Sequence, residues 1–352
     1  MQYVRMADVG DGLCVTLHTV FGDLIQIDCG SQDWKIAYEG LERVSHNLHR
    51  TRAFILSHFH VDHYNGLLYI SQNLRNSPFS TREVYFPRIP EFKDRGLFLN
   101  CLFSMNMRVF GQETGVRECD FLNCIKKINN GVRFGYDALY SGKTVEIGSS
   151  VFEVVWPPAV IDDERTLSAM RKAIEDFQKA LDADEETRRL YEYVKKSSLS
   201  RAYLEEQYER EEFSRYYNDD YPDSKSDEKG LPDVVVNANK SLKKAANHMS
   251  LALFEDNRFL FLGDLEIPEI REVVNHLRSE KRVNFQVFVT PHHGTHWHDS
   301  LRQVRCNYSL VSNGRSMCSK IKLQFKEISQ EMLATFVNGD IRAPNYPARY
   351  FW

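Results

Sequence analysis

The densest group of potential metal-binding side chains lies in residues 58–63, where the sequence reads HFHVDH. Imidazole nitrogens and carboxylate oxygens are donors that zinc prefers, so four such side chains in six residues indicate a metal centre. Side chains two apart in an extended chain point the same way, which would let His58 and His60 share one ion. A helix beginning at Asp62 would turn Asp62 and His63 toward a second ion. The alternative is a polar cluster on the surface.

A further carboxylate follows another buried strand, in the sequence LGDLE at residues 262–266. Asp264 could serve only as the N-cap of the next helix, a position that aspartate favours. Beside a pair of metal ions, however, its carboxylate is well placed to bridge them. We therefore expect Asp264 to be a bridging ligand, with helix capping as the alternative.

Four histidines follow a third buried strand, in the sequence HHGTHWH at residues 292–298. Adjacent residues of an extended chain point to opposite sides, so only one of His292 and His293 should bind metal. We expect that residue to be His293, because Gly294 beside it permits a tight turn and a close backbone approach. The candidates for substrate contact or proton transfer, with an exposed loop position as the alternative, are His292, His296 and His298.

The three segments share one position in the predicted fold, the carboxyl end of a buried strand. Short apolar runs at 52–56, 258–262 and 285–290 precede them, and helical apolar spacing follows the first two. Alternating strands and helices are typical of α/β proteins, whose ligand sites gather at the carboxyl edge of the sheet. We therefore expect these distant segments to converge.

A block rich in charged residues interrupts this alternation between residues 162 and 229. Its apolar residues have helical spacing, forming one stripe and beginning another: Leu167, Met170, Ile174, Phe177 and Leu181, then Leu190, Tyr193 and Val194. We predict a helical insertion at 162–235 between two halves of one domain, 1–161 and 236–352. The insertion is either a solvated helical hairpin packed on the core or a surface that binds a partner protein or covers the substrate.

Composition excludes several classes of protein. The 352 residues include 45 basic and 49 acidic side chains, a net charge of −4, so any contact with a polyanion must be local. The 7 cysteines contain no CxxC pair, which argues against a disulfide framework and a zinc ribbon. No signal peptide is evident, and no apolar run is long enough to span a membrane. We expect a soluble cytoplasmic protein that does not associate with membranes.

Beside HFHVDH, short motifs make the chain resemble the metallo-β-lactamase fold superfamily and, within it, the soluble hydrolase domain of the competence protein ComEC. These motifs are DVGDG at 8–12, IDCG at 27–30, NHMSL at 247–251 with LGD at 262–264, and HHGT at 292–295. The resemblance covers residues 3–160 and 236–341. The chain departs from that family in its helical block and in MCSK at 317–320, where the family usually has a small His-Pro segment.

The resemblance implies an αββα sandwich with a charged helical insertion and a site for two divalent metal ions. Zinc is the expected metal, and manganese and iron are the alternatives. His248 stands where the superfamily often has a third histidine ligand, although it could equally be a buried strand histidine. The expected metal ligands are His58, His60, Asp62, His63, Asp264, His293 and His248. The expected catalytic residues are Asp62, Asp264 and His292.

The expected reaction is hydrolysis by a hydroxide that bridges the two ions, which needs no serine or cysteine nucleophile. The ComEC-like resemblance implies a phosphodiesterase or nuclease. Local positive charge for a phosphodiester, including nucleic acid, is available in Lys240, Lys243, Lys244, Arg302, Arg305, Arg315, Lys320 and Lys322. One alternative is a hydrolase of a small ester, lactone or thioester, which predicts an apolar pocket without cations. Another is a partner-binding subunit with a non-catalytic metal site, docking a protein through residues 162–229.

Overall fold

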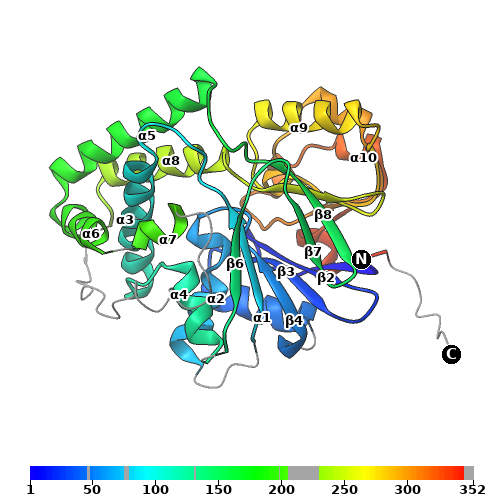
Figure 1. Cartoon of the computed structure of the whole chain (residues 1–352), viewed down its shortest axis with the longest axis horizontal. Helices are drawn as coiled ribbons and strands as arrows, with labels where there is room; N and C mark the ends of the chain where they lie inside the picture. The colour runs from blue at the N-terminus through cyan, green and yellow to red at the C-terminus, as the bar shows by residue number, and fades with distance from the viewer. Residues whose placement is uncertain (46–47, 75–78, 131, 198, 205–229, 345–352) are drawn as a thin grey trace.

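The computed structural model describes residues 1–45, 48–74, 79–130, 132–197, 199–204 and 230–344. Its strands form two sheets of 7 strands each, which pack face to face (Figure 1). The first sheet contains, in spatial order, β14 (Ile341–Ala343), β1 (Tyr3–Met6), β2 (Leu13–His18), β3 (Leu24–Gly30), β4 (Thr51–Ile55), β5 (Glu83–Pro87) and β6 (Gly135–Leu139).

The second sheet is built from the later part of the chain. In spatial order it contains β13 (Ser329–Ala334), β12 (Arg305–Val311), β11 (Asn284–Val289), β10 (Phe259–Phe261), β9 (Ala252–Glu255), β8 (Ser150–Trp156) and β7 (Thr144–Ile147). Strands β9 and β10 form the hairpin expected around residues 256–257. The strand expected to begin at His248 instead begins at Ala252, because a helix continues through Asn247.

Each sheet has a run of four parallel strands, and these runs position the site. Strands β3 to β6 are parallel in the first sheet, and strands β10 to β13 are parallel in the second. The carboxyl ends of neighbouring parallel strands lie at the same edge of a sheet. The loops after β3 and β4 therefore meet at one edge, and those after β10, β11 and β12 meet at another.

Apolar side chains fill the space between the sheets and beneath the outer helices. Alternate residues of the strands, such as Val15, Ile27, Val287 and Val289, form the core between the sheets. Separate groups of buried residues join each sheet to its own helices. The helices along the first sheet are α1 (Trp34–Ser45), α2 (Asn65–Asn73) and α4 (Phe121–Ile128), and those along the second are α9 (Ile267–Ser279) and α10 (Phe325–Ile328), with α11 (Thr335–Asn338) after β13 (Figure 1). The result is an αββα sandwich.

The charged block forms helices that pack against the long helix α3 (Arg95–Thr114) at one end of the sandwich (Figure 1). Aspartates begin two of these helices: the Asp163 carboxylate accepts a hydrogen bond from Thr166 N, and Asp184 accepts one from Thr187 N. The described helices of the block are α5 (Glu164–Ala183), α6 (Glu185–Lys196) and α7 (Leu199–Leu204), and α8 (Asp233–Asn247) follows the block and packs with them.

The apolar stripe predicted in the insertion lies inward. Met170, Ile174 and Phe177 of α5 are buried in the same core as the helices of the first sheet. The insertion boundary expected at residue 235 falls inside α8, which packs along α5 and continues to Asn247. Residues 205–229 of the predicted insertion lie outside the described part of the chain.

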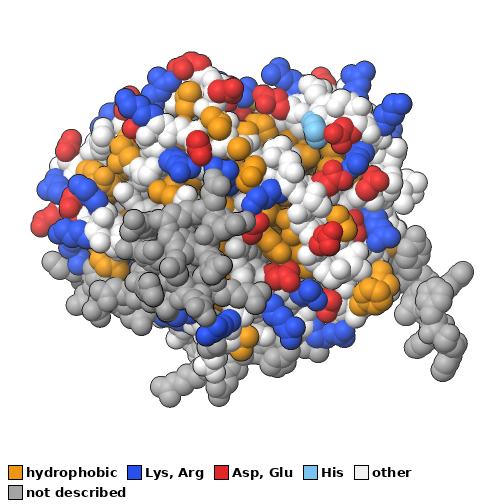
Figure 2. All heavy atoms as spheres, in the orientation of Figure 1, with side chains coloured by type: hydrophobic (Ala, Val, Ile, Leu, Met, Phe, Trp, Pro, Cys, Tyr) orange, Lys and Arg blue, Asp and Glu red, His pale blue; other side chains and the backbone are white. Residues whose placement is uncertain are grey.

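The outer surface of the helical block carries both signs of charge. Figure 2 shows Lys and Arg side chains interspersed with Asp and Glu over the helical part of the face in view. Ion pairs within α5, such as Lys172 with Asp176, account for part of this pattern. No helix among the described residues combines the length and apolar character needed to cross a bilayer.

Candidate metal centre

The HFHVDH segment forms a short loop between β4 and α2. Strand β4 ends at Ile55, and the loop leads through the 3₁₀ turn η2 (Val61–His63) into α2. The side chains of His58, His60 and His63 are almost fully buried. Burial of three imidazoles at the end of a strand is the arrangement expected of metal ligands rather than of a polar surface cluster.

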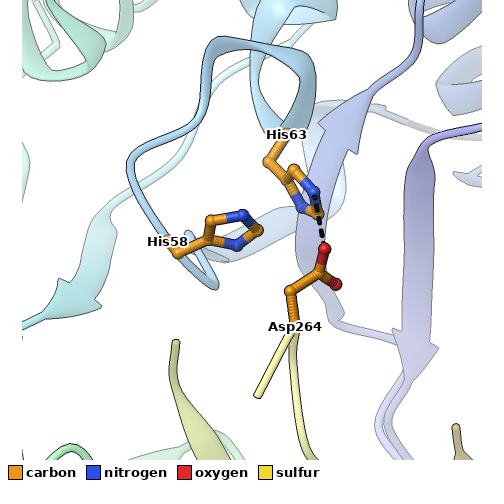
Figure 3. A group of neighbouring side chains, drawn as sticks. All are labelled: His58, His63 and Asp264. Atoms are coloured by element: carbon orange, nitrogen blue, oxygen red, sulfur yellow. Dashed lines mark ion pairs between the residues drawn. The ribbon is translucent and has the colours of Figure 1, made fainter. Parts of the chain in front are cut away.

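Asp264 brings the second sheet to this loop. It follows β10, is buried, and its Oδ2 lies 3.7 Å from His63 Nε2. Figure 3 shows His58, His63 and Asp264 pointing toward one another from opposite chain segments. One donor atom from each of these three residues lies within 4.8 Å of the others, so the group could hold a metal ion.

His293 approaches the same carboxylate from the end of β11. Its Nε2 lies 3.6 Å from Asp264 Oδ2, while its Nδ1 lies 3.0 Å from the backbone oxygen of Ser312. Donation of the Nδ1 hydrogen to that carbonyl leaves the Nε2 lone pair directed at the carboxylate side, as is usual for a ligating histidine. The three distant segments therefore meet at Asp264, as expected from the sequence.

His58 and His60 also converge, in agreement with the expectation that they point the same way. His58 Nε2 and His60 Nδ1 are 2.8 Å apart. The other nitrogen of His58, Nδ1, lies 2.9 Å from Ser57 Oγ. His60 Nε2 is buried and has no hydrogen-bond partner among the described residues. Such a buried donor or acceptor is costly unless another group binds there.

Asp28 orients His63 from behind. Its Oδ2 lies 2.7 Å from His63 Nδ1, and its Oδ1 accepts a 2.7 Å hydrogen bond from the backbone nitrogen of Ser57. Asp28 is fully buried at the end of β3, the strand next to β4. A carboxylate that holds the distal nitrogen of a histidine fixes its tautomer and directs the other nitrogen at a metal.

The electrostatics of His58, His60 and Asp264 suit a divalent cation. At His63 burial would lower the pKa, but Asp28 outweighs it and raises that pKa to about 9, so a metal bound there would have to displace a proton. Burial, and then the neighbouring His63, holds the pKa of His58 well below its ordinary value, and burial lowers the pKa of His60 to about 3. Both imidazoles are therefore neutral and can bind metal at pH 7. Burial alone would raise the pKa of Asp264, but the adjacent imidazoles, His293 first, outweigh it and lower that pKa. The residues present fit a bound divalent metal.

Asp62 lies at the rim of this group and is paired with a lysine. Its Oδ2 accepts a hydrogen bond from Lys243 Nζ at 3.0 Å, and its Oδ1 is buried without a partner among the described residues. Burial would lower the pKa of Lys243, but Asp62 outweighs that effect and raises it, so the lysine remains charged. The role of Asp62 as a ligand and catalytic residue stays a prediction.

His248 lies apart from the group. It caps the C-terminus of α8, and its Nδ1 lies 3.0 Å from Oε1 of the fully buried Glu269 of α9. The structure therefore places this histidine beside Glu269 rather than among His58, His63 and Asp264, and its role as a metal ligand stays a prediction.

The remaining histidines of the HHGTHWH segment lie in two places. His292 and His296 gather with Glu266, and their rings stack with centroids 3.9 Å apart. His298 is the N-cap of the 3₁₀ turn η5 (Asp299–Gln303), where its Nδ1 accepts a hydrogen bond from Ser300 N. Roles for these three residues in catalysis or substrate contact stay predictions.

Sequence reasoning assigned no role to Asp28 or Ser57, and it named Lys243 only as local positive charge. A signal for Asp28 was present: it is a carboxylate near the end of a largely apolar strand. No comparable signal marks Lys243, because 181 residues separate it from Asp62.

Replacing Asp28 with asparagine should weaken metal binding while leaving every direct donor in place. Outer partners of ligating histidines typically contribute about 10- to 100-fold to metal affinity. We expect the dissociation constant for zinc, measured by competition with a chromophoric chelator, to rise by about that factor. The matched change Asp256→Asn, in the exposed turn between β9 and β10, should leave it unchanged. Equal affinities of the Asp28 variant and the native protein would remove the orienting role of this carboxylate.

No family model matches the chain, and no curated protein matches it. Among solved structures, a subclass B3 metallo-β-lactamase from a soil metagenome library shares 16% identity over 44% of this chain and 50% of that one, with a TM-score of 0.26. The YhfI metallo-β-lactamase fold protein from Bacillus subtilis shares 12% over 44% and 54%, with a TM-score of 0.23.

A long form RNase Z from yeast shares 8% identity over 88% of this chain and 37% of that one, with a TM-score of 0.40. This chain thus spans about half of the lactamase's own length and less of the RNase Z. The fold class rests on the chain's own two sheets and outer helices, which confirm the expected αββα sandwich. The finer resemblance to the ComEC hydrolase domain stays a prediction.

Proposed function

We propose that the protein is a metal-dependent hydrolase that cleaves phosphodiesters, with nucleic acid as the main candidate substrate. The observation that carries this proposal is the buried donor group of His58, His63 and Asp264, which lies near the charged Lys243. A bound pair of divalent cations, expected to be zinc, supplies Lewis acidity toward a phosphoryl oxygen and lowers the pKa of water.

Each protein side chain has a distinct part in this proposal. His58, His60, His63 and His293 hold the metal, Asp264 joins the groups from the two sheets, and Asp28 keeps His63 in one orientation. Lys243 keeps its positive charge at the rim of the centre, where it can pair with an anionic oxygen of the substrate as well as with Asp62.

The neighbouring surface suits an anionic substrate. A cavity of about 370 Å³ opens between α5, α8 and the start of α9, and Glu266, two residues beyond Asp264, forms part of its wall. Three basic side chains line it: Arg165, Lys172 and Lys244. Arg165 pairs with Glu269 and Lys172 with Asp176, whereas Lys244 has no ion pair among the described residues.

A second cavity of about 520 Å³ continues along the same two helices. It shares Lys172 and Ser241 with the first and adds Lys179 and Lys240. Asp176 also lines it and pairs with Lys172 and Lys179, so Lys240 is its lysine without an ion pair among the described residues. Basic side chains along neighbouring cavities are the feature expected of a track for a phosphate backbone. A hydrolase of small neutral esters would instead be expected to have an apolar pocket without cationic groups, so these cavities favour a phosphodiester.

The test compares substrates and salt dependence. Zinc- or manganese-loaded protein is assayed on bis-p-nitrophenyl phosphate, single-stranded RNA and DNA, duplex DNA and p-nitrophenyl acetate. We expect cleavage of phosphodiesters, with nucleic-acid affinity that falls as salt rises. Each phosphate contact contributes about 0.7 to the slope of log affinity against log salt for a single strand.

Two charge variants separate the proposed track from bulk charge. Lys172→Gln with Lys244→Gln should make that slope shallower by about 1.4 and raise KM for the single strand. The exposed Lys326 of α10 provides the control, because Lys326→Gln removes one positive charge away from both cavities and should leave the slope unchanged. Hydrolysis of the acetate ester alone, with no phosphodiester cleaved by either metal form, would reject the proposal in favour of a small-ester hydrolase.

A further inference from the structure

A second group of potential metal donors lies close to the main centre but is not part of it. It consists of Glu266, at the N-terminus of α9, with His292 and His296 from the loop after β11. One donor atom of each residue lies within 4.8 Å of the others. All three side chains are partly exposed, in contrast to the fully buried main group, so an ion could reach them directly from solvent.

Outer contacts hold these side chains in orientations suitable for ligation. His296 Nδ1 lies 3.0 Å from the backbone oxygen of Leu265, so donation there leaves Nε2 free as a ligand. The amide of Asn247 donates to Glu266 Oε1 at 3.2 Å and so holds the carboxylate in place. A backbone carbonyl that accepts from a histidine, and an amide that donates to a carboxylate, are typical of the surroundings of metal ligands.

The three donors converge without bonding to one another. Glu266 forms no hydrogen bond or ion pair with either imidazole among the contacts of the described residues, although its carboxylate faces both. The two rings stack with an interplanar angle of 29°. In an ion pair with a protonated histidine, the Glu266 carboxylate would lie in direct contact with the ring. The donor atoms of a metal site instead leave space between them for the ion.

The chain path explains how one loop serves both groups. His292 and His293 both have left-handed backbone conformations, with φ of 47° and 55°. Non-glycine residues rarely adopt this conformation, and two in succession turn the chain sharply. As a result, His293 faces Asp264 in the main group while its neighbour His292 faces Glu266 in the second.

We propose that Glu266, His292 and His296 form a separate zinc site beside the main centre. Two histidines and a glutamate form a known set of three protein ligands for zinc, in which water or another ligand takes the fourth coordination position. Ligand atoms around tetrahedral zinc lie about 3.4 Å apart, so side-chain rotations that move the donor atoms by about 1 Å would complete the site. The proposal concerns metal binding only and does not depend on the proposed hydrolytic function.

Zinc stoichiometry tests the site directly. Metal-free protein is dialysed against excess Zn²⁺, and bound zinc per chain is measured by plasma mass spectrometry. Glu266→Gln and His296→Gln should each bind one ion fewer than the native protein. Glutamine at position 266 can still accept the hydrogen bond from Asn247, so the loss reflects the missing carboxylate rather than the missing contact.

Matched controls lie on the exposed surface of α9. Glu272→Gln and His276→Gln make the same changes of residue type at side chains that are about half exposed, and they should bind as much zinc as the native protein. Circular dichroism identifies any variant that fails to fold, and the other variant then decides. Native zinc content in the folded Glu266 or His296 variant would overturn the proposal.

The main centre is tested separately in the same experiment. Asp264→Asn should lose zinc from the main group yet still lose one further ion when combined with Glu266→Gln. An extra ion that depends on Glu266 and His296, in a protein without hydrolytic activity, would support this site and reject the proposed function. Hydrolytic activity, together with equal zinc content in the native protein and Glu266→Gln, would support the proposed function and reject this second zinc site.

Discussion

Asp264→Asn is expected to lower hydrolytic activity by more than a hundredfold and to reduce bound metal, while leaving the fold in place. Asp264 is the residue at which the two halves of the centre meet: its Oδ2 lies 3.7 Å from His63 Nε2 and 3.6 Å from His293 Nε2. Loss of an outer partner alone costs about 10- to 100-fold in metal affinity or activity, so loss of a direct ligand should cost more.

The charge of Asp264, rather than its shape, carries this effect. Asparagine has nearly the same size, but its amide is a neutral and much weaker ligand for a divalent cation. Burial would favour the protonated acid at position 264, yet the surrounding imidazoles hold its pKa below the usual range. The carboxylate is therefore ionised at neutral pH and compensates the charge of a bound cation, which asparagine does not.

Two measurements decide this prediction: zinc per chain after dialysis, and turnover of bis-p-nitrophenyl phosphate. The control is Asp256→Asn, which makes the same substitution in the exposed turn of the hairpin that leads to Asp264. The control should match the native protein in both measurements. Native turnover in Asp264→Asn would contradict a metal centre built around this carboxylate.

The convergence of the site was predictable because it follows from local pattern and a general rule of sheets. HFHVDH, Asp264 and His293 each follow a buried strand, and each of those strands is parallel to a neighbour in its sheet. Once an apolar run is identified as a buried strand, its carboxyl end must lie at the edge where parallel neighbours also end. The spacing of His58 and His60 likewise specified their common direction before any tertiary contact was known.

Contacts with the helical block were not predictable in the same way. Lys243 reaches Asp62 only because α8 packs along α5 and both helices pack on α3. Neither the spacing nor the charge of residues 240–244 distinguishes a lysine directed at the centre from its solvated neighbours. The same cause explains the late start of β9: α8 buries Val235, Ala238 and Leu242 and thereby extends through Asn247.

Domain boundaries were harder to predict than the elements themselves. Sequence composition separated residues 162–229 from the rest, but Met170, Ile174 and Phe177 pack into the same core as the helices of the first sheet. Two arginines of the first half of the chain pair with acidic residues of the block, Arg108 with Asp184 and Arg117 with Glu186. The charged composition of residues 162–229 indicates which side chains contact solvent. A domain boundary depends instead on which surfaces of the chain pack together.

Gly30→Ala is expected to destabilise the protein and to disrupt metal binding together. Gly30 ends β3, directly beneath the HFHVDH loop. A β-carbon built on it would overlap the carbonyl carbon and oxygen of Asp62 and the Cα of His63. These are backbone atoms, so they cannot rotate away as a side chain could. Relief of the overlap requires the loop or the strand to move.

The expected size follows from this rigidity. Forcing an extra methyl group into a packed region typically costs about 1–3 kcal/mol, and an overlap with backbone lies at or above the upper end. The same displacement would move His58, His60 and His63 relative to Asp264, so zinc affinity should fall as well. The motif IDCG at residues 27–30 thus has a steric reason for its final residue, independent of any unusual backbone angle.

Gly96→Ala is the matched control, because its β-carbon would lie in α3 and would contact only Leu204 Cδ1, at 3.7 Å. Its effect on the free energy of unfolding should stay below about 1 kcal/mol. Urea unfolding of the metal-free forms measures the fold without the contribution of bound metal, and zinc titration measures the site. We expect Gly30→Ala to lose both stability and zinc affinity and Asp264→Asn to lose zinc affinity alone. This difference would distinguish the packing of β3 beneath the loop from the direct binding of metal by Asp264. Native stability and zinc affinity in Gly30→Ala would show that the loop does not rest on β3 in this way.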